Sequence, residues 1–189
     1  MFSLDNQNVL VTSVSGNGEN HGTEIKLGMT VAVKFTVGNT ILNQFGDNYL
    51  QALYERGPED DADLDAQGKP DLLPVMRIPN MKPLGIKWDG AGYRVIFHQG
   101  LSGDEDIILI QSAIDSVVFD CKQGGSVEVA LKIKCHPFEA EDRGALLGLI
   151  KQPCDITLEP PSAEDIAQME LDAAAGDEDD EPDTDNLLD

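Results

Sequence analysis

Positive charge is scarce in this sequence, which has 13 Lys and Arg residues against 35 Asp and Glu residues and a formal net charge of −22. A uniformly acidic surface repels nucleic acid. Binding to DNA or RNA therefore requires the few basic residues to lie close together, because exposed charges are screened beyond about 8 Å at physiological salt. The chain also lacks a run of about 18 apolar residues, the length that a membrane-spanning helix needs.

Cysteine is also rare, and the three residues Cys121, Cys135 and Cys154 show no spacing typical of a disulfide framework or a zinc site. His136 could join them around a metal, but Cys135 falls on the apolar side of an alternating segment, where cysteine behaves as a small hydrophobe. The first residues have neither the basic segment nor the long apolar segment of a secretory signal. We therefore expect free thiols and a cytoplasmic protein.

Motifs for catalysis are missing as well. The turn-rich segment 15–22, which we expect to be a loop, is not followed by the Lys-Ser or Lys-Thr of a phosphate-binding loop. Residues 100–103 lack the spacing of a nucleophile elbow, and His98 has no partner recognisable in the sequence. The carboxylates of residues 59–65 lack the central Gly and terminal Glu of an ordered calcium loop. We expect no enzyme, no metal and no cofactor.

Acidic residues are concentrated at the C-terminus, where residues 161–189 hold twelve of them and no Lys or Arg. Like charges repel one another, and this stretch has too few apolar side chains to offset the entropy lost on ordering. We predict a β-rich globular domain over residues 1–160 followed by a disordered acidic tail over 161–189. The domain then holds 23 acidic and 13 basic residues, a net charge of −10.

Apolar and polar residues alternate with the period of a β-strand over residues 31–37 and 127–135. Helical spacing of apolar residues predicts a helix from about 40 to 54, and a second short helix is expected after Pro137. Further strands are predicted over residues 9–14, 93–98, 106–120 and 154–158. The elements do not alternate as β-α-β units, which favours a mainly β (α+β) fold: an antiparallel sandwich or a partly open barrel with two short helices.

One stretch of the chain, residues 72–103, carries a local excess of positive charge and also contains the only tryptophan. Cations neutralise phosphates and aromatic rings stack on bases, so this composition is typical of a surface that binds single-stranded nucleic acid. Two lysines on the polar side of the strand at 127–135 extend the set. The alternative is that the aromatic residues belong to the core and the lysines to ordinary surface. The candidate nucleic-acid-binding residues are Arg77, Lys82, Lys87, Trp88, Tyr93, Arg94, Lys132 and Lys134.

Three segments, residues 21–24, 90–93 and 119–125, resemble a family of small bacteriophage and prophage proteins that tend to be encoded near recombination and replication genes. The resemblance implies a bacterial host cytoplasm. The tail is similar to the flexible, acidic, apolar-tipped tails with which single-stranded-DNA-binding proteins dock onto replication and repair partners. It departs from the bacterial examples, which end in Pro-Phe. The candidate docking residues are Asp183, Asp185, Leu187, Leu188 and Asp189. A tail that only increases solubility is the alternative.

The leading hypothesis from the sequence is a non-enzymatic phage-type protein that binds single-stranded DNA or assists recombination and replication proteins. Its tail would dock partners and screen the basic groove from DNA. A second hypothesis is an acidic inhibitor that mimics DNA and blocks a host DNA-binding protein. A third is a virion structural or assembly protein, and an oligomer is compatible with each of them.

Overall fold

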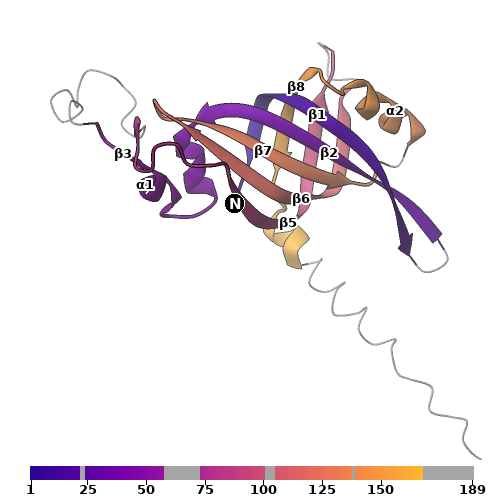
Figure 1. Cartoon of the computed structure of the whole chain (residues 1–189). Coiled ribbons are helices and arrows are strands. Elements are labelled where there is room, and N and C mark those ends of the chain that lie inside the picture. The colour runs from indigo at the N-terminus through magenta and orange to yellow at the C-terminus, as the bar shows by residue number, and fades with distance from the viewer. Residues whose placement is uncertain (22–23, 58–72, 101–104, 138, 168–189) are drawn as a thin grey trace, which may run out of the picture.

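The computed structural model of the protein describes residues 1–21, 24–57, 73–100, 105–137 and 139–167. Within these ranges, six long or medium strands form a closed barrel, and two short strands form a separate small sheet (Figure 1). The barrel strands are β1 (Leu4–His21), β2 (Glu24–Gly38), β5 (Leu84–His98), β6 (Ile107–Lys122), β7 (Ser126–Cys135) and β8 (Pro153–Glu159). The other labelled elements are η1 (Asn39–Gln44), α1 (Tyr49–Leu53), β3 (Tyr54–Glu55), β4 (Val75–Met76) and α2 (Ala140–Gly148). Residues 163–167 are also helical, and Ser162 caps them through hydrogen bonds with Asp165, so the prediction of a disordered tail over 161–189 is wrong for its first residues. Residues 168–189 of the predicted tail lie outside the described residues.

The strands of the barrel follow one another in the order β1-β2-β7-β6-β5-β8, and every neighbouring pair is antiparallel. The sheet closes because β8 pairs with β5 on one side and with β1 on the other. Register shifts in the β1–β2, β1–β8, β5–β6 and β6–β7 pairs mark bulges, which bend strands and increase their twist enough for a sheet to close on itself. The predicted mainly β, antiparallel fold is confirmed, and its form is a closed barrel.

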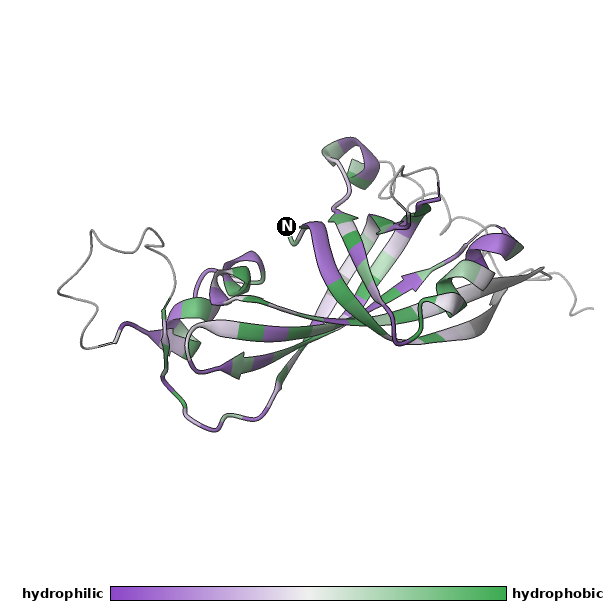
Figure 2. Ribbon diagram, turned by 90° about the horizontal axis from the view of Figure 1, so that it is seen from above, coloured by the Kyte–Doolittle hydropathy of each residue, from purple (hydrophilic) through white to green (hydrophobic). Residues whose placement is uncertain are grey.

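Alternate residues of each strand fill the inside of the barrel. On β7 the apolar positions from Val127 to Cys135 are all buried, while the residues between them are half-buried or exposed. The same alternation appears as successive hydrophobic and hydrophilic bands along the strands in Figure 2. Among the largest fully buried side chains are Phe97 and Phe119. The barrel therefore has a packed core, in which apolar side chains from all six strands meet.

An aromatic cluster lies where η1 and α1 cover one end of the barrel (Figure 1). The ring of Phe45 lies 4.5 Å from Phe2, 5.1 Å from Trp88 and 4.9 Å from Phe119, measured between centroids. The last two contacts are edge-to-face, the arrangement that aromatic quadrupoles favour. The helix α2 lies at the opposite end of the barrel in the same view. Among the described residues, no helix is long and apolar enough to cross a membrane.

Two local predictions are wrong. The single helix expected from 40 to 54 is two short helices, η1 and α1, separated at Gly46. A Cβ at Gly46 would lie 2.8 Å from the ring of Tyr49. Glycine therefore lets the backbone of this turn lie against the ring without a clash. The loop expected at residues 15–22 is instead strand as far as His21, because β1 continues to pair with β2 up to the His21–Glu24 partners. Backbone hydrogen bonds to β2 outweigh the turn preference of these residues.

The hydroxyl of Tyr54 joins the small sheet to the tip of the β6–β7 hairpin. Its oxygen lies 3.1 Å from both the backbone nitrogen and the carbonyl oxygen of Lys122, and 2.9 Å from the carbonyl oxygen of Ser126. The Lys122 amide donates to it, and it donates in turn to one of the two carbonyls. Burial raises the pKa of this phenol, so it stays protonated and able to donate.

We expect Tyr54→Phe to lower the free energy of unfolding by about 1–3 kcal/mol, because removing the hydroxyl leaves buried backbone groups of the hairpin without a partner. Urea unfolding followed by circular dichroism measures the change. Tyr49→Phe is the matched control, since Tyr49 is only partly buried. Equal stability of the Tyr54→Phe variant and the original protein would show that the hydroxyl contributes nothing to joining the two parts.

A candidate nucleic-acid interface on the outer face of the barrel

The two aromatic residues expected to stack on bases point into the barrel. Tyr93 is 3% exposed, and burial raises the pKa of its phenol. Trp88 is half-buried and packs against the core through Phe45. A Cβ at Gly90 would lie 2.8 Å from the Tyr93 ring and 2.9 Å from the indole nitrogen of Trp88, so glycine lets the two rings pack under β5. The prediction that Tyr93 offers its ring to a base is wrong, and Trp88 belongs to the core edge.

Three of the predicted basic residues lie apart from one another. Arg77 follows β4, where its guanidinium lies 3.2 Å from the carboxylate of Glu55 and also donates to the carbonyl oxygen of Tyr54. Arg94 is on β5, where it pairs at 2.9 Å with Glu159 of β8. Lys82 is exposed in the segment between β4 and β5. Arg77 and Arg94 are therefore each paired with a carboxylate from a different strand.

The remaining predicted lysines do come together. Lys132 and Lys134 point outward from β7, and Lys87 points outward from β5. Lys87 pairs with Ser116 of β6, which lies in the bulge opposite Lys132. The sequence prediction missed a fourth member, Lys34 of β2, whose Cα partner is Ala130, two residues before Lys132. We call the outward surface formed by Lys34, Lys87, Lys132 and Lys134 the lysine face.

The side chains between these lysines are small. Ala32 lies directly opposite Lys132, Ala130 lies opposite Lys34, and Thr30 lies opposite Lys134. Two lysines separated by one residue on a strand are about 7 Å apart, and neighbouring strands are about 4.8 Å apart. The lysine face thus spans about 15 Å across β2, β7, β6 and β5, with no large described side chain between Lys34, Lys132 and Lys134 to shield their ammonium groups.

Two carboxylates accompany the lysine face. Lys134 pairs with Asp115 at 3.2 Å, and Lys34 pairs with Glu128 at 2.8 Å. The four lysines of this surface outnumber the two carboxylates that these ion pairs place beside them, in a protein whose net charge is −22. Exposed ion pairs stabilise a protein by only about 0–1 kcal/mol, so a phosphate group can replace either carboxylate at little cost.

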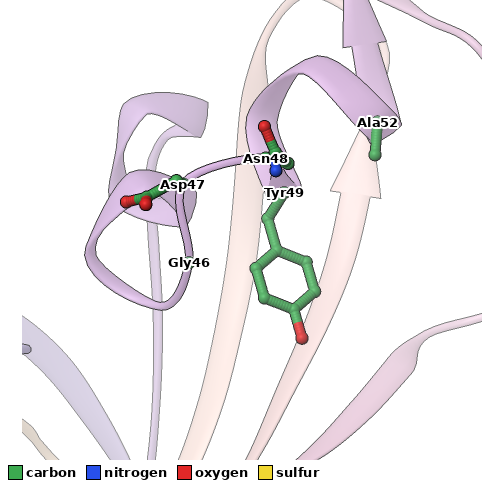
Figure 3. Close-up of a pocket in the computed structure, with 5 residues that line it drawn as sticks. All are labelled: Gly46, Asp47, Asn48, Tyr49 and Ala52. Carbon is green, nitrogen blue, oxygen red and sulfur yellow. The ribbon is translucent and has the colours of Figure 1, made fainter.

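A shallow pocket of about 340 Å³ lies between η1 and α1 and is lined by Gly46, Asp47, Asn48, Tyr49 and Ala52. Figure 3 shows the carboxylate of Asp47, the amide of Asn48 and the ring of Tyr49 pointing in different directions. Because its polar groups do not converge on one point, this pocket offers no arrangement for acid–base or nucleophilic chemistry.

The cysteines are free and buried, each in a different strand of the barrel. Burial raises the pKa of the Cys135 thiol to about 12 and that of Cys154 to about 11, so both stay protonated at neutral pH. Among the described residues, no three His, Cys, Asp or Glu side chains lie close enough to hold a metal ion. The acidic loop at 59–65 and the docking residues Asp183, Asp185, Leu187, Leu188 and Asp189 lie outside the described residues.

No protein family model matches the chain, and neither curated proteins nor solved structures show a significant similarity to it. The resemblance to bacteriophage and prophage proteins stays a prediction.

Proposed function

We propose that this protein binds nucleic acid by contacting phosphate groups with the lysine face, as a phage-type protein that assists recombination or replication. One observation supports this more than any other. In a chain with only 13 basic residues, four lysines from three strands point outward from one continuous surface, with small residues between those of β2 and β7. Contacts to the phosphate backbone supply nearly all of the affinity of non-specific nucleic-acid binding. The lysine ammonium group binds phosphate as a compact positive charge.

The arrangement favours contacts to the backbone over contacts to bases. The rings of Trp88 and Tyr93 pack toward the core, so the stacking that single-stranded-DNA-binding proteins use is not offered by the residues we first expected. The outer side of a closed barrel is also convex, so it contacts only one side of a nucleic-acid chain and does not enclose it. We therefore expect single-stranded and duplex DNA of equal length to bind with similar affinity, and with little sequence preference.

Fluorescence anisotropy with a labelled oligonucleotide tests this proposal, with salt as the variable. Binding through three or four phosphates predicts that log Kobs falls with log salt concentration with a slope of about −3, since each neutralised phosphate contributes about −0.9 on duplex DNA. The dissociation constant is expected in the range of about 10⁻⁴–10⁻⁶ M that is typical of non-specific binding. No change in anisotropy at low salt with either DNA form would overturn the proposal.

We propose that the acidic tail competes with DNA for the lysine face. Residues 161–189 carry twelve acidic side chains and are separated from the end of β8 by a single residue, so they meet the barrel at a high effective concentration. We expect deletion of 161–189 to tighten DNA binding several-fold at low salt, and to change the salt dependence only modestly. Comparing the anisotropy titrations of the full and shortened chains measures this. Unchanged affinity would show that the tail does not screen the face.

Charge balance favours a second candidate function, the mimicry of DNA. Arg77, Arg94 and Lys122 are each paired with a carboxylate, and the chain as a whole is strongly acidic. An inhibitor of this kind would bind a basic host protein and would not bind DNA. Capture of a DNA-binding protein from host lysate, together with no shift of a labelled oligonucleotide, favours mimicry over the lysine-face proposal.

A further inference from the structure

Three polar side chains on another part of the barrel surface form a continuous hydrogen-bonded chain. His98 ends β5, Asp106 directly precedes β6, and Thr157 lies on β8. The Nδ1 atom of His98 lies 2.9 Å from Oδ2 of Asp106, and its Nε2 atom lies 2.8 Å from Oγ1 of Thr157. A hydroxyl, an imidazole and a carboxylate joined in this order are the groups that nucleophilic hydrolases use, and both distances are within hydrogen-bond range.

The other contacts of Asp106 determine which nitrogen of His98 carries the proton. The backbone N–H of Gln99 donates to Oδ1 of Asp106 at 2.9 Å, which fixes the carboxyl group. This hydrogen bond, together with that from His98, lowers the pKa of Asp106, so the group is a carboxylate at neutral pH and can only accept. The neutral imidazole must then place its proton on Nδ1, and its Nε2 lone pair faces the hydroxyl of Thr157. The hydroxyl therefore donates to a base.

A second observation points to the same hydroxyl. The backbone N–H of Asn6 donates to Oγ1 of Thr157 at 3.1 Å. Asn6 has a positive φ of 44° and lies in the register shift between Leu4 and Gln7, where the β1–β8 ladder is interrupted. A positive φ is uncommon outside glycine, although Asn tolerates it better than most residues. The interruption turns one amide of β1 toward Thr157, where it fixes the position of Oγ1 and stabilises the negative charge that develops on this atom as its proton passes to His98.

On one side of Thr157, the side that faces β5 and β6, the surface carries apolar residues. Its Cα partner on β5 is Ile96, whose own partner on β6 is Ile108. Ile108 is 48% exposed and Ile110, two residues further along β6, is 51% exposed. Large apolar side chains next to a hydroxyl that faces a base provide a surface for a short apolar acyl chain.

From this geometry we propose that Thr157, His98 and Asp106 form an acyl-transfer site that accepts small apolar esters. Thr157 Oγ1 attacks the ester carbonyl carbon while its proton passes to Nε2 of His98. The bond to the alcohol oxygen then breaks, and the alcohol leaves with that proton. Water attacks the resulting acyl-threonine, its proton returns through His98 to Thr157 Oγ1, and the carboxylic acid is released. Asp106 holds the imidazole and stabilises its charged form throughout.

Incubation of the full chain with p-nitrophenyl butyrate tests this proposal. We expect release of p-nitrophenol together with a butyryl adduct that peptide mass spectrometry assigns to Thr157. Thr157→Val should abolish both, and His98→Gln and Asp106→Asn should lower the acylation rate at least about 100-fold, within the range that general-base catalysis contributes. Thr157→Ser should keep or increase the rate, because it keeps the hydroxyl and relieves crowding around it.

The location of the adduct on the original protein decides the result, whatever the stability of the variants. An adduct found only on lysines or on His98, or no adduct on Thr157 at any time, would overturn the proposal. Thr157→Ser controls for folding, since it preserves the hydrogen bonds to His98 and Asn6. Failure of this site and failure of DNA binding are distinguishable, because the first is read from the adduct on Thr157 and the second from the anisotropy of a labelled oligonucleotide.

Discussion

Phe119→Ala is expected to lower the free energy of unfolding by about 3–5 kcal/mol, the usual cost of removing a buried phenylalanine side chain. Phe119 is fully buried in β6, and its ring meets that of Phe45 at 4.9 Å. Its partners in the neighbouring strands are Leu84 and Val129, so the change opens a cavity where β5, β6, β7 and η1 meet. Neighbouring strands are tied by hydrogen bonds and cannot collapse freely into the gap.

Urea unfolding followed by circular dichroism measures this effect. Ile110→Ala is the matched control, because Ile110 lies on the same strand and is 51% exposed, so its change is expected within about 0.5 kcal/mol. If both variants lose the same stability, the aromatic cluster does not anchor the end of the barrel as described.

The second large effect is expected on DNA binding. Replacing Lys87, Lys132 and Lys134 with Glu removes three phosphate contacts and makes the lysine face strongly negative. We expect affinity at low salt to fall at least about 100-fold, and any residual binding to lose most of its salt dependence, because each lost phosphate contact removes about 0.9 from the slope. Anisotropy titrations with the same labelled oligonucleotide measure the difference.

The matched control combines Arg56→Glu, Lys82→Glu and Lys151→Glu, at three exposed basic residues outside the lysine face. Both variants have the same net charge, so a general effect of added negative charge would weaken them equally. The lysine-face proposal expects the control to keep affinity within a few-fold of the original protein. An equal loss of affinity in the two variants would show that binding depends on net charge and not on the lysine face.

The individual strands were predictable because they are half-buried and alternate. The segment 127–135 has an apolar residue at every second position, and β7 (Ser126–Cys135) follows it closely. The closure of the sheet was not predictable, since it depends on bulges such as those around Asn6 and Ser116, which no periodicity reveals. The length of β1 was missed because its glycines indicate turns when read locally, while pairing with β2 is a long-range property.

The candidate interface was predictable in part. The polar side of the strand at 127–135 placed Lys132 and Lys134 correctly, and the same alternation over 31–37 contained the signal for Lys34. That β2 and β7 are neighbours could not be read from the sequence, so Lys34 was not joined to them. Tyr93 shares its position in the alternation with Phe97, and this spacing already favoured the core over the surface.

The hydroxyl–imidazole–carboxylate chain left no signal in the sequence. Thr157 lies 59 residues from His98, and the two meet only because β8 pairs with β5 on one side and β1 on the other. Asp106 is closer, at 8 residues, but an acidic residue after a strand is ordinary. Groups that are brought together by the closing strand of a barrel become visible only in the structure.

Backbone amide chemical shifts of the ¹⁵N-labelled chain, followed while a short oligonucleotide is added, report whether the lysine face binds DNA. Binding at the lysine face predicts progressive shifts at Lys34, Lys87, Lys132 and Lys134 and at their strand neighbours, with the amides around His98 and Thr157 unchanged. Shifts confined to any other surface, or a spectrum that the oligonucleotide does not alter, would contradict it.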